Sequence, residues 1–174
     1  MALALCDWLT ANALEGGPVP FALPVADLTA CAPFWVGTDP TEPSLQITAA
    51  VVAQAQRLAA LQPEVAAHPW VQEATTWCVD AAGRADADTH AIELMFTLQA
   101  LDTVAEHDDA AASQLEHLAA LIPASGALPV AGGAEGESLQ LLDLSPWPET
   151  PLRALPGHRE RRGRPGPLGG RSCA

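Results

Sequence analysis

His90 and Glu93 have a spacing at which two side chains could act together. They are three positions apart, so on one helix they share a face, and an imidazole and a carboxylate there could bind a metal ion. A metal centre in a helical bundle takes several such ligands from different helices. One pair does not meet this requirement. We therefore interpret Asp88, His90 and Glu93 as groups that cap and solvate a helix start, and we expect no metal and no cofactor.

The sequence contains no complete motif for a nucleophilic or a phosphate-binding site. No serine stands in a GxSxG motif, and the glycine-rich stretch 132–136 lacks the lysine and the preceding strand of a phosphate loop. The cysteines form no CxxC pair. We expect thiols in a reducing cytosol, buried or incidental, at Cys6, Cys31, Cys78 and Cys173.

Four tryptophans are the remaining candidates for a site, and they are Trp35, Trp70, Trp77 and Trp147. If the long loops fold over one end of the domain, these indoles could line an apolar cavity with acidic rims. In the alternative interpretation they anchor the loops to the helical layer. The sequence leaves both interpretations open.

Charge divides the 174 residues into an acidic body and a basic end. Residues 1–155 hold three arginines against twenty acidic residues, a formal charge of −17, while residues 156–174 carry +4. An acidic body argues against binding to nucleic acid or to an anionic membrane surface. No apolar run approaches the roughly 18 residues of a membrane span, so we expect a cytoplasmic protein.

Periodicity and capping residues predict an all-α domain of about five helices, at 2–14, 44–61, 69–82, 88–106 and 109–122. The helix at 88–106 is apolar on nearly every side, so we expect it at the centre, with Asp88 and Thr89 capping it. In the helix at 44–61, alanines allow a close helix neighbour. Its expected apolar stripe is Ile47, Val51, Leu58 and Leu61.

Two long Pro/Gly-rich segments share a pattern. Gly17 and Gly126 are 109 positions apart, and each precedes an apolar piece with Pro-Val and then a helix start, at TEPSL (41–45) and at ETPL (149–152). This offset predicts repeated helical hairpins with long loops on one rim. We expect a domain over 1–155 and, from its Gly, Pro and Arg content, a disordered basic tail over 156–174.

The segments HPWVQEATTWC, IELMFTLQALDTV, HLAALIPASGALPV and LDLSPWPETPLRAL together resemble bacterial proteins of the prenyltransferase and squalene-oxidase repeat family. The resemblance implies an α/α toroid like that of terpene cyclases and protein prenyltransferases, here as a partial copy. The catalytic aspartate motif and the zinc ligands of those enzymes have no counterpart in this sequence, so no functional residue carries over.

The leading functional hypothesis is therefore a non-catalytic helical-repeat scaffold that binds a protein partner or an apolar, isoprenoid-like ligand. Association with a partner or with itself would cover helix faces that a partial toroid leaves open. One alternative is an enzyme of isoprenoid metabolism whose catalytic acids lie outside this chain. The other is a truncated product without function.

Overall fold

Helices make up most of the structure, a computed structural model that describes residues 1–148 and 150–155. The longer helices are α1 (Ala2–Asn12), α3 (Leu45–Ala59), α5 (Pro69–Ala82), α6 (Ala91–Val104) and α7 (Asp109–Leu121). Shorter helical turns are α2 (Pro33–Val36), α4 (Pro63–Ala66), α8 (Leu141–Leu144) and α9 (Pro151–Ala154). One small antiparallel pair joins β1 (Leu128–Pro129) to β2 (Ser138–Leu139). The predicted all-α class is confirmed, while the predicted tail at 156–174 lies outside the described residues.

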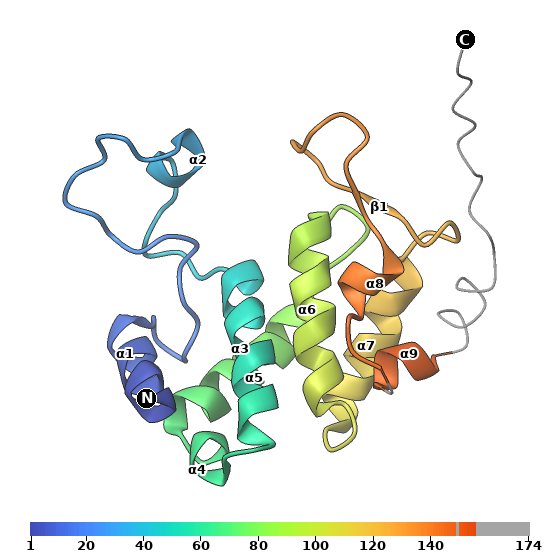
Figure 1. Cartoon of the computed structure of the whole chain (residues 1–174), viewed down its shortest axis with the longest axis horizontal. Coiled ribbons are helices and arrows are strands. Elements are labelled where there is room, and N and C mark those ends of the chain that lie inside the picture. Colours follow the sequence, from blue (N-terminus) through green and yellow to red (C-terminus); the bar gives the residue numbers. More distant parts are fainter. Residues whose placement is uncertain (149, 156–174) are drawn as a thin grey trace.

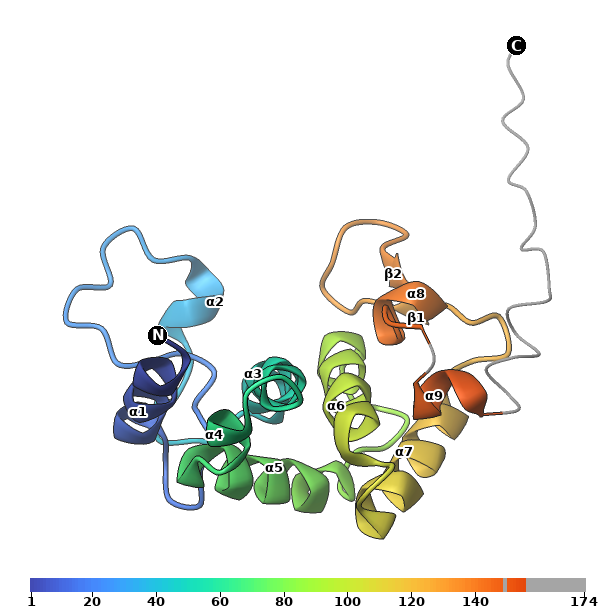
Figure 2. The same cartoon turned by 60° about the horizontal axis from the view of Figure 1, so that its bottom comes forward.

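The longer helices lie in two layers. In Figure 1, α3 and α6 lie side by side and run in the same direction. Figure 2 shows α5 and α7 in a second layer against them, with α1 at one end of the molecule and α8 and α9 at the other. Both long loops, 13–44 and 122–140, extend from the same end of the helices (Figure 1).

The helix α6 is the centre of this arrangement, as its apolar sequence predicts. It packs against α3, α5, α7, α8 and α9. Its buried residues are Ala91, Leu94, Thr97, Leu98, Gln99, Ala100, Leu101 and Asp102. Such a helix can be buried on most sides only because few of its side chains need water.

The predicted start of α6 is wrong by a short distance. Its N-cap is His90, whose Nδ1 accepts a hydrogen bond from the backbone N–H of Ile92 at 3.3 Å. The hydroxyl of Thr89 instead accepts from the backbone of Asp86, closing the preceding turn. The imidazole of His90 thus caps α6, whereas the sequence predicted that Asp88 and Thr89 would cap it.

The predicted apolar stripe of α3 holds for three of its four residues, because Ile47, Val51 and Leu58 pack partly buried against the core and Leu61 does not. The buried face of this helix consists of small residues, Thr48, Ala49, Val52, Ala53, Ala55 and Ala59, because α3 is packed between α5 and α6. Ile47, Val51 and Leu58 are only half-buried, and Leu61 is 80 % exposed. Small side chains allow the close approach of α6 that the alanines predicted, and the larger ones pack at the margin of the same core.

Both long loops begin with the same local geometry. Gly17 and Gly126 have φ of +95° and +76°. Three residues later Pro20 pairs with Pro43 in an isolated antiparallel bridge, and Pro129 pairs with Ser138. Ser138 is therefore the counterpart of Pro43, and the element that follows is α8. Helices also start at the two predicted places, α3 at Leu45 and α9 at Pro151.

Within the described ranges, no helix is long and apolar enough to cross a membrane.

Candidate functional site

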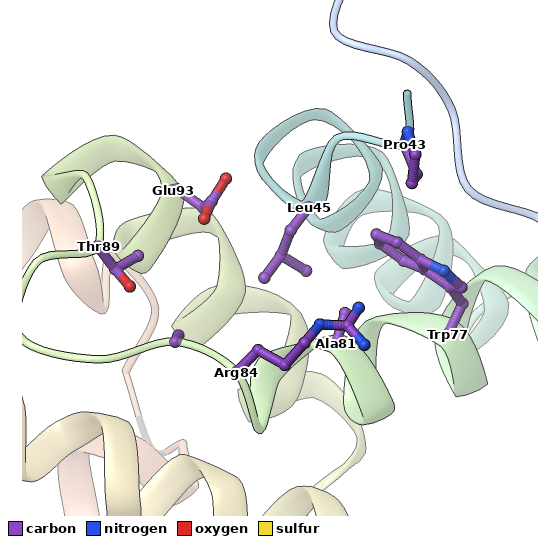
Figure 3. Close-up of a pocket in the computed structure, with 8 residues that line it drawn as sticks. Pro43, Leu45, Trp77, Ala81, Arg84, Thr89 and Glu93 are labelled. Carbon is purple, nitrogen blue, oxygen red and sulfur yellow. The ribbon is translucent and has the colours of Figure 1, made fainter. Parts of the chain in front are cut away.

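A hollow of about 240 Å³ opens between the N-terminal ends of α3 and α6, over the C-terminal half of α5. Figure 3 shows its lining, which is Pro43, Leu45, Trp77, Ala81, Arg84, Ala85, Thr89 and Glu93. The volume lies just below the roughly 300–1,000 Å³ of drug-sized sites. It therefore suits a small molecule or a single inserted side chain.

Capping residues fix each wall of this hollow. The side chain of Ser44 accepts from the backbone of Ile47 and starts α3 beside Leu45. At the end of α5, the backbone N–H of Arg84 donates to the carbonyl of Ala81 and directs the chain away from the helix. Three helix ends therefore meet here, and each is held by local hydrogen bonds.

The charges in the hollow lie on opposite sides. The Arg84 side chain extends along the floor toward Trp77, while Glu93 lies across from it beyond Leu45 (Figure 3). Among the described residues, no hydrogen bond or ion pair reaches the Arg84 guanidinium. A free guanidinium beside an indole and an aliphatic wall can bind the oxygen-bearing end of a molecule whose apolar part rests on Trp77.

The structure does not bring the four candidate tryptophans together. Trp77 alone lines this hollow. Trp70 is 1 % exposed, and its indole N–H donates to the carbonyl of Gly17 at 2.9 Å. Trp35 packs against Phe21 within the first long loop, at a centroid distance of 5.2 Å. Trp70 thus fits the loop-anchoring interpretation, and Trp77 is the candidate ligand contact.

The fourth tryptophan belongs to a polar cluster near the C-terminal ends of α3 and α6. The guanidinium carbon of Arg57 lies 3.2 Å from the centroid of the Trp147 ring, in a cation–π contact. Beside this pair, Arg153 donates to the backbone carbonyl of buried Ser145. Arg57 comes from α3 and Trp147 from the loop after α8, so the contact joins the N-terminal and C-terminal halves of the chain.

Asp102 is the residue of this cluster that sequence reasoning missed. Asp102 is 6 % exposed, and its carboxylate accepts a hydrogen bond from the backbone N–H of Leu152 at 2.6 Å, at the start of α9. Burial raises its pKa, against the hydrogen bonds from Leu152 and Thr150 and the nearby positive charges of Arg57 and Arg153. A lone acid in the apolar run LQALDTV was the signal available in the sequence. This carboxylate holds a helix end in place.

Two histidines, His90 and His68, also act as structural links. His90 caps α6 with one ring nitrogen, and the other, Nε2, lies 3.0 Å from the carbonyl of Ala131 in the second long loop. His68 caps α5 in the same way and contacts Asp7 of α1 at 3.2 Å. In residues 1–148 and 150–155, no group of three His, Cys, Asp or Glu side chains is placed to hold a metal ion.

Comparison with known proteins completes this description of the site. The family resemblance, with the functions that it implies, remains a prediction. No protein-family model, curated protein or solved structure matches the chain.

Proposed function

We propose that the chain is a non-catalytic helical-repeat scaffold of the α/α-toroid kind, whose hollow at Trp77 and Arg84 binds a small apolar molecule with one anionic end. The two helix layers support the toroid part of this proposal. The helices α3 and α6 run in parallel in one layer, and the connections between and after them return through α5 and α7 in the other (Figure 2). Inner and outer helices alternate in this way in the toroids that the sequence resembles.

The observation that carries the binding proposal is the free guanidinium of Arg84 beside the Trp77 ring. An isoprenoid-like chain offers an apolar body for Trp77, Leu45 and Pro43, and a phosphate or carboxylate end offers oxygen acceptors for Arg84. The other titratable group in the lining, Glu93, lies on the far wall. Two groups so separated favour orientation of a ligand over proton transfer between them.

The thiols support the proposal that the scaffold is cytoplasmic. Cys6, Cys31 and Cys78 are free, and burial raises the pKa of Cys78 to about 12, so this thiol is unreactive. Free cysteines are typical of a reducing compartment. We therefore place the scaffold in the cytoplasm.

Calorimetric titration of the full chain with geranyl phosphate and with geraniol tests the binding proposal. Both molecules carry the same apolar chain, and only the phosphate offers Arg84 an anion. Arg84→Gln should weaken geranyl phosphate about fivefold, because an exposed ion pair contributes about 1 kcal/mol, and should leave geraniol unchanged. Glu93→Gln is the matched control, and it should not weaken the phosphate because it removes a like charge.

Trp77→Ala should weaken both molecules, since it removes the wall that the apolar chain contacts. The proposal is wrong if the wild-type chain binds neither probe. It is also wrong if Arg84→Gln and Trp77→Ala leave the affinity for geranyl phosphate unchanged, because the molecule would then bind elsewhere.

A further inference from the structure

The hollow between α3 and α6 is lined by two side chains of opposite charge that do not pair with each other. Glu93 belongs to the first turn of α6, and Arg84 follows the end of α5. Of the hydrogen bonds and ion pairs within residues 1–148 and 150–155, none involves the Glu93 carboxylate or the Arg84 guanidinium. An acid in the first turn stabilises a helix through its dipole, but this effect does not require the acid to line a hollow. The two side chains therefore offer one acceptor group and one donor group to a molecule that enters.

An apolar side chain separates these two charges. Leu45, the first residue of α3, stands between Glu93 and Arg84 in Figure 3. The one hydroxyl of the lining, on Thr89, already accepts a hydrogen bond from the backbone N–H of Asp86 at 2.8 Å. The charged contacts that a ligand can make are thus at two opposite walls, with an apolar surface between them.

The charge of the whole domain also bears on the ligand. Residues 1–155 carry a formal charge of −17, so a purely anionic molecule is repelled from the surface around the hollow. Inside the hollow, Arg84 would attract one negative charge, while Glu93 would oppose any other. A molecule with one negative and one positive end has no net charge to be repelled, and it is complementary to both walls.

The positions of the charges distinguish between two kinds of dipolar molecule. In an α-amino acid the ammonium and the carboxylate are attached to one carbon, so both lie at the same end of the apolar side chain. In an ω-amino acid they lie at opposite ends, as Arg84 and Glu93 lie on opposite walls. We propose that the hollow binds a dipolar molecule of this second class, with its anionic end on Arg84, its ammonium on Glu93 and its apolar middle against Leu45. This inference rests on the proposed binding of an anion at Arg84, and it adds the cationic end of the ligand.

Four molecules with six-carbon chains, a length that suits a hollow of about 240 Å³, test this proposal. In 6-aminohexanoate the charges are at opposite ends, in its isomer norleucine they are at one end, and hexanoate and hexylamine carry a single charge each. Chemical-shift titration of the ¹⁵N-labelled full chain gives each Kd. The indole N–H signal of Trp77, assigned with Trp77→Phe, locates the binding in the hollow. We expect 6-aminohexanoate to bind about fivefold more tightly than hexanoate, the effect of one exposed ion pair, and more tightly than norleucine.

Glu93→Gln removes the acceptor for the ammonium while keeping the size of the side chain. It should weaken 6-aminohexanoate about fivefold, and it should not weaken hexanoate, because it removes a like charge. The matched control is Glu64→Gln, since Glu64 is an exposed acid in the first turn of α4 and does not line the hollow. This control removes the same charge from the chain and should bind all four molecules as the wild type does. Arg84→Gln should weaken 6-aminohexanoate and hexanoate alike, and it should not weaken hexylamine.

Equal weakening by Glu93→Gln and Glu64→Gln would overturn the proposal, because the ammonium would then respond to net charge alone. Equal or tighter binding of norleucine would also overturn it, since the ligand would not need its charges at opposite ends.

Geranyl phosphate, titrated into the same samples, separates this proposal from the one on which it rests. If geranyl phosphate binds beside Arg84 but 6-aminohexanoate binds no better than hexanoate, the dipolar ligand alone is refuted. If neither geranyl phosphate nor 6-aminohexanoate shifts the Trp77 signal, both proposals fail.

Discussion

Replacement of Gly17 by alanine should unfold the protein far more readily than the same change at its neighbour Gly16. Both residues have positive φ, +95° at Gly17 and +84° at Gly16. A Cβ at Gly17 would lie 2.8 Å from the backbone nitrogen of Ala74 in α5, while a Cβ at Gly16 would meet nothing within 4 Å. The two variants therefore share the strain of the turn, and only one of them meets the helix.

The magnitudes follow from these distances. An L-residue in the left-handed region costs about 1–2 kcal/mol, offset by about 0.4–1 kcal/mol because alanine restricts the unfolded chain. Gly16→Ala should thus cost about 1 kcal/mol. At Gly17 the added methyl overlaps backbone that cannot rotate away, and such overpacking adds about 1–3 kcal/mol, for a total near 3 kcal/mol.

Urea and thermal unfolding followed by circular dichroism measure the difference. For a chain of this size about 1 kcal/mol corresponds to about 2–4 °C, so Gly16→Ala should lower Tm by a few degrees and Gly17→Ala by roughly 6–12 °C. Equal shifts in the two variants would refute the close contact between the first long loop and α5. The carbonyl of Gly17 also accepts the Trp70 indole N–H, so loss of this contact would free the start of the loop.

Three further changes test other parts of the structure. Trp70→Phe leaves the carbonyl of Gly17 buried without its donor, so it should lower the free energy of unfolding by about 1–3 kcal/mol in a urea titration. Ser44→Ala removes the cap of α3 and should cost about 1 kcal/mol by the same assay. Burial raises the pKa of Asp102 above its ordinary value of 3.8. The protonated Asp102 side chain therefore contributes fully to stability below pH 3.8, and this contribution is lost as the pH rises through the folded-state pKa. Asp102→Asn does not titrate, so wild type should lose stability relative to this variant as the pH rises through that window, and parallel stability curves would contradict the assignment.

Local sequence signals were sufficient for the longer helices. Pro63 opens α4 and Pro69 opens α5, each at a position where the absence of a backbone N–H costs nothing. The central position of α6 followed from a composition with few groups that need water. Such signals act within one helical turn, so a single sequence contains them in full.

Features that depend on tertiary contacts were not predicted, or were predicted incorrectly. The most deeply buried side of α3 depends on where α6 and α5 lie, and the alanines there are buried more fully than the larger Ile47 and Val51. The role of Asp102 depends on α9, which begins 49 positions later in the chain. The four tryptophans looked like one set by residue type, but their separation in space is a property of the layers that hold them.

The distribution of arginine supports Arg84 as the ligand contact. Residues 1–155 contain only three arginines, and in the described structure two of them have evident structural partners. Arg57 stacks on Trp147 and Arg153 donates to the carbonyl of Ser145, so both hold the segment that carries α8 and α9. Arg84 makes no such contact, although acidic residues are abundant across the body. A guanidinium that no residue of 1–148 or 150–155 pairs, beside an apolar hollow, is available to an anion from outside, which is why the replacement of Arg84 is the sharpest test of ligand binding.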